Sequence, residues 1–313
     1  MRQMRKLSIS ESSKIFKKNV CKDKYLLLLA APVLIYYFVF HYLPMYGAVI
    51  AFKDFSPGQS IWSSTWVGFR WFKEFFASIY FTRLISNTIM LSSLSLIFSF
   101  PVPIIFALLL NEVRRKNLRR IIQTISYLPH FISLVVMIGI LSNFLSPSDG
   151  VINQLLRRFG MEPVNFMGES VWFRPLYIGS GIWQNYGWNS IIYMAALTSI
   201  DPQLYEAARI DGCNRWKEMR YITLPGIRST AVMLLILALG NLMNIGFEKI
   251  ILMYSPAIYD VSDVISTYVY RRGILNSQYS FGSAVGLLNS IINFILLLSV
   301  NRISRHYTQI GLW

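Results

Sequence analysis

A polar island between two long apolar runs decides the fold of this chain. It reads Asp201-Pro202-Gln203-Leu204-Tyr205-Glu206-Ala207-Ala208-Arg209-Ile210-Asp211-Gly212-Cys213-Asn214-Arg215-Trp216 and runs on to Ile222-Thr223-Leu224-Pro225. Asp201 can cap a helix that starts at Pro202, and Gly212 can end that helix at the C′ position. Asn214 can cap a second short helix, which we expect Pro225 to stop before the next apolar run. The stretch therefore predicts a compact helix-turn-helix outside the bilayer.

The composition places the rest of the chain in a membrane. Of the 313 residues, 54% are hydrophobic and 14% are charged, whereas soluble domains carry roughly 25% charged residues. Lysine and arginine outnumber aspartate and glutamate by 30 to 15, but the basic residues cluster beside apolar runs, as the positive-inside rule describes. We therefore interpret the basic charge as a topology signal and expect no nucleic-acid partner.

Six apolar runs have the length of membrane spans. They lie at about residues 25–43, 84–110, 121–145, 172–200, 230–253 and 281–300 and make up a membrane domain of residues 25–303. Residues 1–24 form a basic N-terminus, residues 201–228 the polar loop, and residues 304–313 a tail. The segments that would then be cytosolic hold 20 of the 30 lysines and arginines. We therefore predict an all-α, multi-pass membrane protein with six transmembrane helices, a cytosolic helix-turn-helix between spans 4 and 5, and both termini in the cytosol.

The chain carries no motif for catalysis or nucleotide binding. It has no G-x-x-x-x-G-K-[ST] loop, no nucleophile elbow, no His-Glu-x-x-His pair and no acidic metal cluster. Its two cysteines, Cys21 and Cys213, are both expected in the cytosol, where a disulfide is not expected. We therefore predict no catalytic residue, no metal site and no cofactor in this chain, so that energy for any transport must come from a partner.

The polar island resembles the EAA signature of the membrane subunits of ATP-binding-cassette (ABC) importers. The matching residues are Glu206, Ala207, Ala208, Asp211, Gly212, Ile222, Leu224 and Pro225. The sequence departs from the usual pattern at Cys213, Met219 and Ser229, where the family has Ala, Phe and often Pro. In that family the signature forms the coupling helix that sits in a groove of the ATPase. The resemblance implies that Glu206 pairs with a basic group of that groove and that Gly212 supplies the turn.

The resemblance extends from about Lys24 to Trp313, to the permeases paired with lipoprotein-type polysaccharide receptors, a branch of the maltose-permease-like importers. It is carried by Phe40-His41-Tyr42-Leu43-Pro44-Met45-Tyr46-Gly47, Ala107-Leu108-Leu109-Leu110-Asn111-Glu112, Tyr127-Leu128-Pro129-His130-Phe131-Ile132-Ser133, Thr267-Tyr268-Val269-Tyr270-Arg271 and Gly311-Leu312-Trp313. It implies a second homologous permease, two ATPase subunits that use ATP and Mg, and an extracytoplasmic solute-binding protein. It also implies a bacterial cytoplasmic membrane and a complex oligosaccharide or polysaccharide as cargo, moved by alternating access. The saccharide, its length and linkage, and whether the two permeases are identical stay open.

Three of the predicted spans carry polar side chains at helical spacing. The candidates for a substrate path are Asn185 and Asn189 on the fourth span, Asn241, Asn244 and Glu248 on the fifth, and Asn289 and Asn293 on the sixth, with Trp188 as a stacking surface for a sugar. Steps of three and four residues put each set on one helix face, which should turn away from lipid. For each Asn two interpretations stay open, a hydrogen bond that holds helices together and a wall that exchanges hydrogen bonds with a sugar. For His130 we favour helix packing, and for Lys249 snorkelling to the outer interface.

Two other classes of membrane protein fit the sequence less well. An ion-coupled secondary carrier would use buried carboxylates near the bilayer midplane of two related halves, but Glu248 is essentially the single candidate acid and no such symmetry is evident. A structural membrane protein would not need the signature loop. A permease of the same superfamily for a non-sugar solute also stays open.

Overall fold

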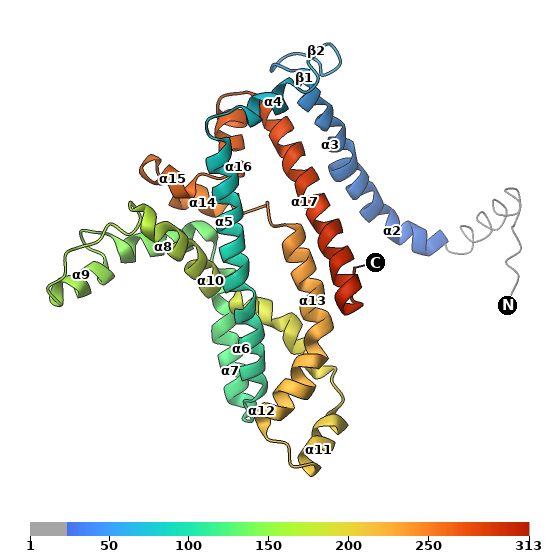
Figure 1. Cartoon of the computed structure of the whole chain (residues 1–313), viewed down its shortest axis with the longest axis vertical. Helices are drawn as coiled ribbons and strands as arrows, with labels where there is room; N and C mark the ends of the chain where they lie inside the picture. The colour runs from blue at the N-terminus through green and yellow to red at the C-terminus, as the bar shows by residue number, and fades with distance from the viewer. Residues whose placement is uncertain (1–23, 313) are drawn as a thin grey trace, which may run out of the picture.

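The computed structural model describes residues 24–312, and this part of the chain is almost entirely helical (Figure 1). The predicted basic N-terminus lies outside the described residues except for Lys24, and so does Trp313. The strands found in the described part are β1 (Lys53–Asp54) and β2 (Thr65–Trp66), which pair antiparallel. The helical fold class is therefore confirmed, apart from this short ribbon.

The first predicted span is a helical run from Lys24 to Phe52. It consists of α2 (Lys24–Tyr37), a π-helical segment (Phe38–Tyr42), α3 (Leu43–Met45) and a 3-10 segment (Tyr46–Phe52). α2 has no buried residue and stands apart from the other helices in Figure 1, whereas the 3-10 segment packs against the last long helix. Only the end of this span is therefore held by the rest of the chain.

The second predicted span is also a single helical run. After the short α4 (Arg70–Phe76), α5 (Phe81–Ser99) continues through Phe100 into α6 (Pro101–Asn111). Phe100 keeps helical backbone angles, φ −68° and ψ −43°. Pro101 and Pro103 are tolerated here because a proline in the first turn of a helical segment disturbs it least.

The third predicted span, residues 121–145, is not one straight helix. α7 (Lys116–Tyr127) and a 3-10 turn (Leu128–Phe131) meet α8 (Leu134–Leu145) at a bend of 97°. Pro129 lies in the 3-10 turn, Ile132 is extended, and Ser133 caps α8 by accepting the Val136 N–H at 3.3 Å. Proline and a new N-cap thus break the run, and α9 (Val151–Arg158) follows.

The fourth predicted span, α10 (Ser170–Thr198), is the central helix of the fold. It contacts α5, α6, α7 and the helix after the polar loop, and it lies at the middle of the molecule in Figure 1. At Gly187 the backbone of α10 comes so close to α7 that a Cβ would lie 2.1 Å from the Ser126 carbonyl oxygen. Its 29 residues include Arg174, Gln184 and Asn185, and it is not among the helices apolar enough to count as a membrane span by composition.

The polar loop and the fifth predicted span differ from the prediction in two ways. α11 (Pro202–Ile210) is followed by α12 (Arg215–Glu218), a π-helical turn (Met219–Thr223) and α13 (Leu224–Gly240), which form one helical run from Arg215 to Gly240. Pro225 therefore does not stop the second helix. It sits in the first turn of α13, after a π-helical turn in which the Leu224 N–H donates to the Met219 carbonyl oxygen, so the wider turn accommodates a residue without an N–H.

The second difference is at the other end of this run. The helix stops at Gly240, residues 241–246 are not helical, and a separate α14 (Phe247–Met253) follows. The expectation that Asn241, Asn244 and Glu248 share one helix face is therefore wrong.

The chain ends in the longest helix. After α15 (Tyr259–Ser262), α16 (Ile265–Val269) and a π-helical segment (Tyr270–Leu275), α17 spans Tyr279–Thr308. The sixth predicted span is thus longer than residues 281–300, and the predicted tail is helical up to Thr308. Residues 310–312 fold back on α17, where the Leu312 N–H donates to Asn301 Oδ1 at 2.8 Å.

Within residues 24–312, four helical runs are long and apolar enough to cross a membrane. They are Lys24–Phe52, Phe81–Asn111, Arg215–Gly240 and Tyr279–Thr308, and the bent pair of α7 and α8 raises the number to five. Three clusters of buried apolar side chains join the run Phe81–Asn111 to other helices, around Leu91 and Ile250, around Leu84 and Phe281, and around Ala107 and Ile227. The chain is therefore a membrane protein of several helices.

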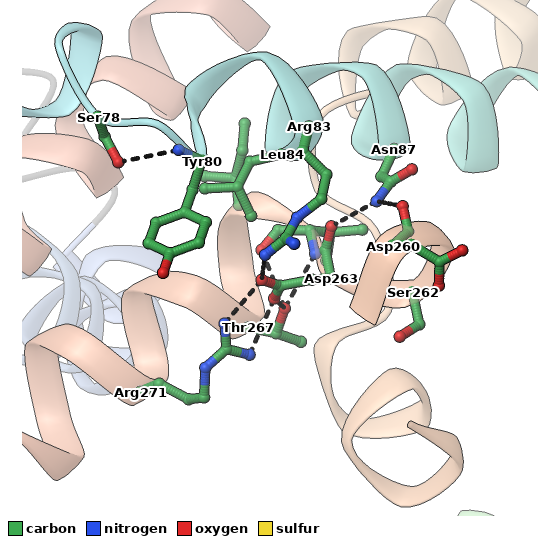
Figure 2. A network of polar contacts seen from close by, with 12 residues as sticks. Ser78, Tyr80, Arg83, Leu84, Asn87, Asp260, Ser262, Asp263, Thr267 and Arg271 are labelled. Atoms are coloured by element: carbon green, nitrogen blue, oxygen red, sulfur yellow. Dashed lines mark hydrogen bonds and ion pairs between the residues drawn. The ribbon is translucent and has the colours of Figure 1, made fainter. Parts of the chain in front are cut away.

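A buried ion-pair network ties α5 to the α15–α16 region (Figure 2). The Asp263 carboxylate is fully buried and accepts from Arg271 at 2.7 and 2.9 Å, from Arg83 at 3.3 Å and from the Thr267 hydroxyl at 2.8 Å. Asn87 adds hydrogen bonds to the carbonyl oxygens of Asp260 and Asp263. Burial alone would lower the pKa of Arg271, but the hydrogen bonds and charge of Asp263 outweigh it and raise that pKa. Asp263 is thus the centre of this corner of the molecule.

Asp263→Asn should destabilise the protein strongly, because it leaves Arg83 and Arg271 facing each other without a counter-ion. Breaking a buried pair by removing one partner costs about 3–5 kcal/mol. The control is Asp54→Asn, whose partner Arg70 is 3.5 Å away with both side chains about half exposed. Loss of such an exposed pair lowers the free energy of unfolding by about 0–1 kcal/mol. Thermal unfolding of the purified protein should show a much larger drop for Asp263→Asn, and equal drops would contradict this role.

Candidate functional site

The polar loop is built by three local signals that act as predicted. Asp201 Oδ1 accepts the Gln203 N–H at 2.9 Å, and Asn214 Oδ1 accepts the Lys217 N–H at 2.9 Å. Gly212 has a φ of +75°. The Cys213 N–H then donates to the Ala208 carbonyl oxygen and the Gly212 N–H to that of Arg209, the pair of bonds that closes a Schellman motif. The two caps and the glycine turn are therefore confirmed.

Side-chain contacts that the sequence did not predict brace α11 against the next helix. Arg209 Nε donates to Glu218 Oε1 at 3.0 Å, and the Tyr205 and Thr223 hydroxyls lie 3.0 Å apart. Arg215 reaches Glu112, at the end of α6, at 3.4 Å. These partners are far apart in sequence or on different helices, so spacing alone could not show them. The first two contacts hold α11 to the base of the helical run Arg215–Gly240, and the third ties that run to the end of α6.

The outer side of the loop offers both charge and apolar surface. Glu206, Ala207, Asp211 and Gly212 are exposed, whereas Ala208 is buried. Leu224 and Pro225, the last residues of the predicted signature, lie in the first turn of α13. The exposed apolar side chains, missed in the sequence, are Leu204, Ile210 and Trp216, at 53%, 87% and 75% exposure. A hollow of about 570 Å³, lined in part by Glu206, Arg209 and Glu218, lies beside them.

The second site is a cavity of about 640 Å³ among α5, α6, α10, α13 and the non-helical residues 241–246. Four of the eight predicted path residues line it: Asn185, Asn189, Asn241 and Asn244. Ser92, Ser95, Ser99 and Gln184 add further polar groups that the sequence did not single out. The wall is therefore largely apolar but carries polar side chains, mostly neutral, that can exchange hydrogen bonds with hydroxyl groups.

The other four predicted path residues do not line this cavity. Asn289 donates to Asn244 Oδ1 at 2.8 Å and so orients a wall residue. Asn293 is buried, and its Oδ1 accepts the Met243 N–H at 3.0 Å, so it holds the non-helical residues 241–246 to α17. Trp188 stacks on the His130 ring at 4.6 Å between centroids, and Glu248 is exposed.

His130 and Asn185 join α10 to the bend before α8. His130 Nδ1 lies 3.0 Å from Asn185 Oδ1, while Asn185 Nδ2 donates to the Gly181 carbonyl oxygen at 3.0 Å. The preference for His130 as a packing residue agrees with this geometry. Asn185 serves both interpretations, because it lines the cavity and also holds two helices together.

Lys249 points inward, contrary to the expectation that it snorkels to the interface. The residue is 8% exposed, and its ammonium donates to the Tyr177 carbonyl oxygen at 2.7 Å. The ammonium also lies 4.7 Å from the centroid of the Tyr177 ring. The reason is the break after Gly240, because α14 turns back against α10 and carries Lys249 to the cavity wall.

The described residues offer no group of three or more His, Cys, Asp or Glu side chains arranged to hold a metal ion. Cys213 is a free cysteine of partial exposure, and Cys21 lies outside the described residues.

Comparison with known proteins identifies the family. Residues 99–309 match the family described as the inner membrane component of binding-protein-dependent transport systems. The chain belongs to this family. It is 46% identical to Protein LplB of Bacillus subtilis (strain 168) over 292 residues, 93% of this chain and 92% of that protein. It is 42% identical to the polygalacturonan/rhamnogalacturonan transport system permease protein YteP of the same organism, over 96% of both chains.

A solved structure agrees with the family membership. A crystal structure of a bacterial ABC transporter involved in the import of the acidic polysaccharide alginate contains a chain that is 44% identical to this one. The match has a TM-score of 0.86 and covers 94% of this chain and 99% of that one. The predicted resemblance to ABC importer permeases is confirmed, and this membership decides against an ion-coupled carrier.

Substitutions at Gly212 should separate the turn from the side chain. Gly212→Val forces a β-branched residue into a left-handed conformation that costs about 1–2 kcal/mol even for ordinary residues, whereas Gly212→Asn is tolerated there. No neighbouring atom lies within 4 Å of a Cβ at this position, so the two variants differ in backbone strain and not in crowding. Hydrogen exchange of the Cys213 amide should rise roughly 5–30-fold in Gly212→Val and stay near wild type in Gly212→Asn. Equal exchange in both would contradict the turn.

Proposed function

We propose that this chain is one permease subunit of an ABC importer that moves a complex oligosaccharide or polysaccharide across the bacterial cytoplasmic membrane. The observation that carries the proposal is the arrangement of the helical run Arg215–Gly240. The capped loop with exposed Glu206 lies at one end of this run, and the polar cavity begins at the other. A partner ATPase would act on the first end and the cargo would pass at the second.

The proposed partners are a second homologous permease, two ATPase subunits that bind ATP and Mg, and an extracytoplasmic solute-binding protein. Support comes from the alginate importer, a second crystal structure of which holds an alginate pentasaccharide-bound periplasmic protein and matches this chain with a TM-score of 0.87 and 43% identity. The exposed apolar side chains of α2 fit contact with lipid.

In the proposed mechanism the loop couples the two ends by alternating access. Glu206 would pair with a basic group in the ATPase groove, while Ala207, Leu204 and Ile210 supply apolar contact around it. ATP-driven closure of the ATPase pair would push α11, tilt the helices and open the cavity outward. Hydrolysis in the partner would return it inward.

The amides of the cavity wall support a saccharide as cargo. Asn189, Asn241 and Asn244 present amides that both donate and accept hydrogen bonds, as a ring hydroxyl does. Asn293 and Trp188 are assigned to helix packing instead. A permease for a non-sugar polyol is the second candidate, since such a cargo would use the same amides.

The proposed topology has six spans. One is α10, although its polar residues keep it from counting as a span by composition, and another is the bent α7–α8 pair. Single cysteines in a cysteine-free background should be labelled from the cytosol at positions 116 and 214 and from outside at positions 58 and 149, all of which are exposed. In Figure 1 the starts of α7 and α12 lie at the lower end and the β1–β2 ribbon at the upper end. Outside labelling at 214 would overturn the proposal, because an ATPase could not reach the loop.

Glu206→Lys should uncouple transport while the membrane domain stays folded. A charged interfacial group left without its partner costs roughly 2–5 kcal/mol, enough to weaken ATPase docking more than tenfold. Glu162→Lys, an exposed charge reversal in the loop after α9, is the control. The measurement is saccharide uptake and ATPase activity of reconstituted complexes, with and without loaded binding protein. Wild-type uptake and stimulation in Glu206→Lys would remove α11 as the coupling element.

A further inference from the structure

The cavity has one charged lining residue, Lys249. All the other residues found to line it are neutral, and within residues 24–312 no carboxylate pairs with the Lys249 ammonium. Its neighbour Glu248 is exposed. Of the three ammonium N–H groups, one donates to the Tyr177 carbonyl oxygen, and the described residues provide no hydrogen-bond partner for the other two.

The surroundings of Lys249 leave room for the ammonium. A Cβ at Gly181 would lie 3.0 Å from Lys249 Nζ, and a Cβ at Gly246 would lie 2.9 Å from the Tyr177 hydroxyl. Both glycines also line the cavity. Larger residues at these positions would push the ammonium or the Tyr177 ring away from the wall.

An unpaired ammonium in this position is unfavourable by itself. Tyr177 and Gly181 belong to α10, away from its ends, so the charge lies well inside the bundle. A carbonyl oxygen and a ring face stabilise an ammonium less than a counter-ion does, and ionisable residues inside membrane domains usually mark the path of an ion or substrate. The missing counter-ion is therefore expected from the cargo.

We propose that Lys249 is the anion-recognition residue of the cavity and that the cargo is an acidic saccharide, whose carboxylate pairs with the Lys249 ammonium. The ring hydroxyls of the saccharide exchange hydrogen bonds with nearby amides such as Asn185 and Gln184. The inference rests on the proposed function and narrows its substrate class. A single cation among neutral groups suits a polymer that carries one carboxylate on each acidic sugar ring. The cargoes named for two relatives, alginate and polygalacturonan, have this chemistry.

The test uses the reconstituted complex with its own binding protein and matched pairs of cargo. The probes are galacturonate and mannuronate tetrasaccharides, their methyl-esterified forms, and a neutral arabinan tetrasaccharide. The variants are Lys249→Met, which keeps the chain length and removes the charge, and Lys249→Arg, which keeps the charge. Lys73→Met, at an exposed lysine of α4, is the control. The binding protein is the same in every arm, so its preference cancels in the ratio of variant to wild type.

We expect the wild type to import an acidic tetrasaccharide better than its ester. Lys249→Met should lower uptake of the acid at least tenfold, equivalent to about 1.4 kcal/mol, and leave its low uptake of the ester within twofold. Lys249→Arg should restore preference for the acid, and Lys73→Met should match wild type.

Several outcomes would overturn the proposal. Equal losses of uptake for acid and ester would show that Lys249 has a structural role and does not recognise the cargo carboxylate. Loss of the second permease on purification of Lys249→Met would show that Lys249 is needed for assembly with that partner. Unchanged acid uptake in Lys249→Met would show that the residue does not recognise cargo. A wild type that imports only the neutral saccharide would remove this inference and leave the proposed function standing. Import of no saccharide at all would remove both.

Discussion

A backbone or side-chain polar group inside a bilayer needs a partner within the protein, and the structure around the cavity depends on this constraint. Residues 241–246 leave helical geometry in the middle of an apolar run, which is tolerated only where irregular backbone is buried in protein or lines a polar cavity. Here it is both. The Met243 N–H donates to Asn293 Oδ1 at 3.0 Å, and Asn241 and Asn244 turn into the cavity. Asn293 thus satisfies a backbone N–H that the break in the helix leaves free, and the break in turn places Asn241 and Asn244 at the cavity wall.

The sequence predicted local features well and tertiary ones poorly. Asp201, Gly212 and Asn214 were identified because a cap or a left-handed turn depends on a few neighbouring residues. The bend at residues 132–133 was marked by Pro129 but was hidden in a long apolar run. The break after Gly240 was missed for the same reason, because apolar residues continue on both sides of it. Hydropathy reports where a chain is buried, and not whether its backbone stays helical there.

The candidate site shows the same division. Four of the predicted path residues reach the cavity wall, whereas Asn293 and Trp188 make packing contacts within the protein. A helical spacing predicts which residues share a face, but it does not predict what that face contacts. The sequence predicted Lys249 at the outer interface, because the residue lies close to the outer end of the predicted fifth span. Its true position depends on α14 folding back against α10, and so on the Tyr177 carbonyl oxygen 2.7 Å away. A partner 72 residues distant in sequence leaves no local signal.

The braced loop and the broken span together determine where a movement would be absorbed. The run Arg215–Gly240 has 26 residues, about 39 Å at 1.5 Å per residue. Arg209–Glu218 and Tyr205–Thr223 fasten α11 to its first turns, so a push on α11 is passed to the helix as a whole. The hydrogen-bonded helix is stiff, whereas residues 241–246 lack its ladder. In the proposed function the displacement is therefore taken up at this segment, which positions Asn244 and, through α14, Lys249 at the cavity wall.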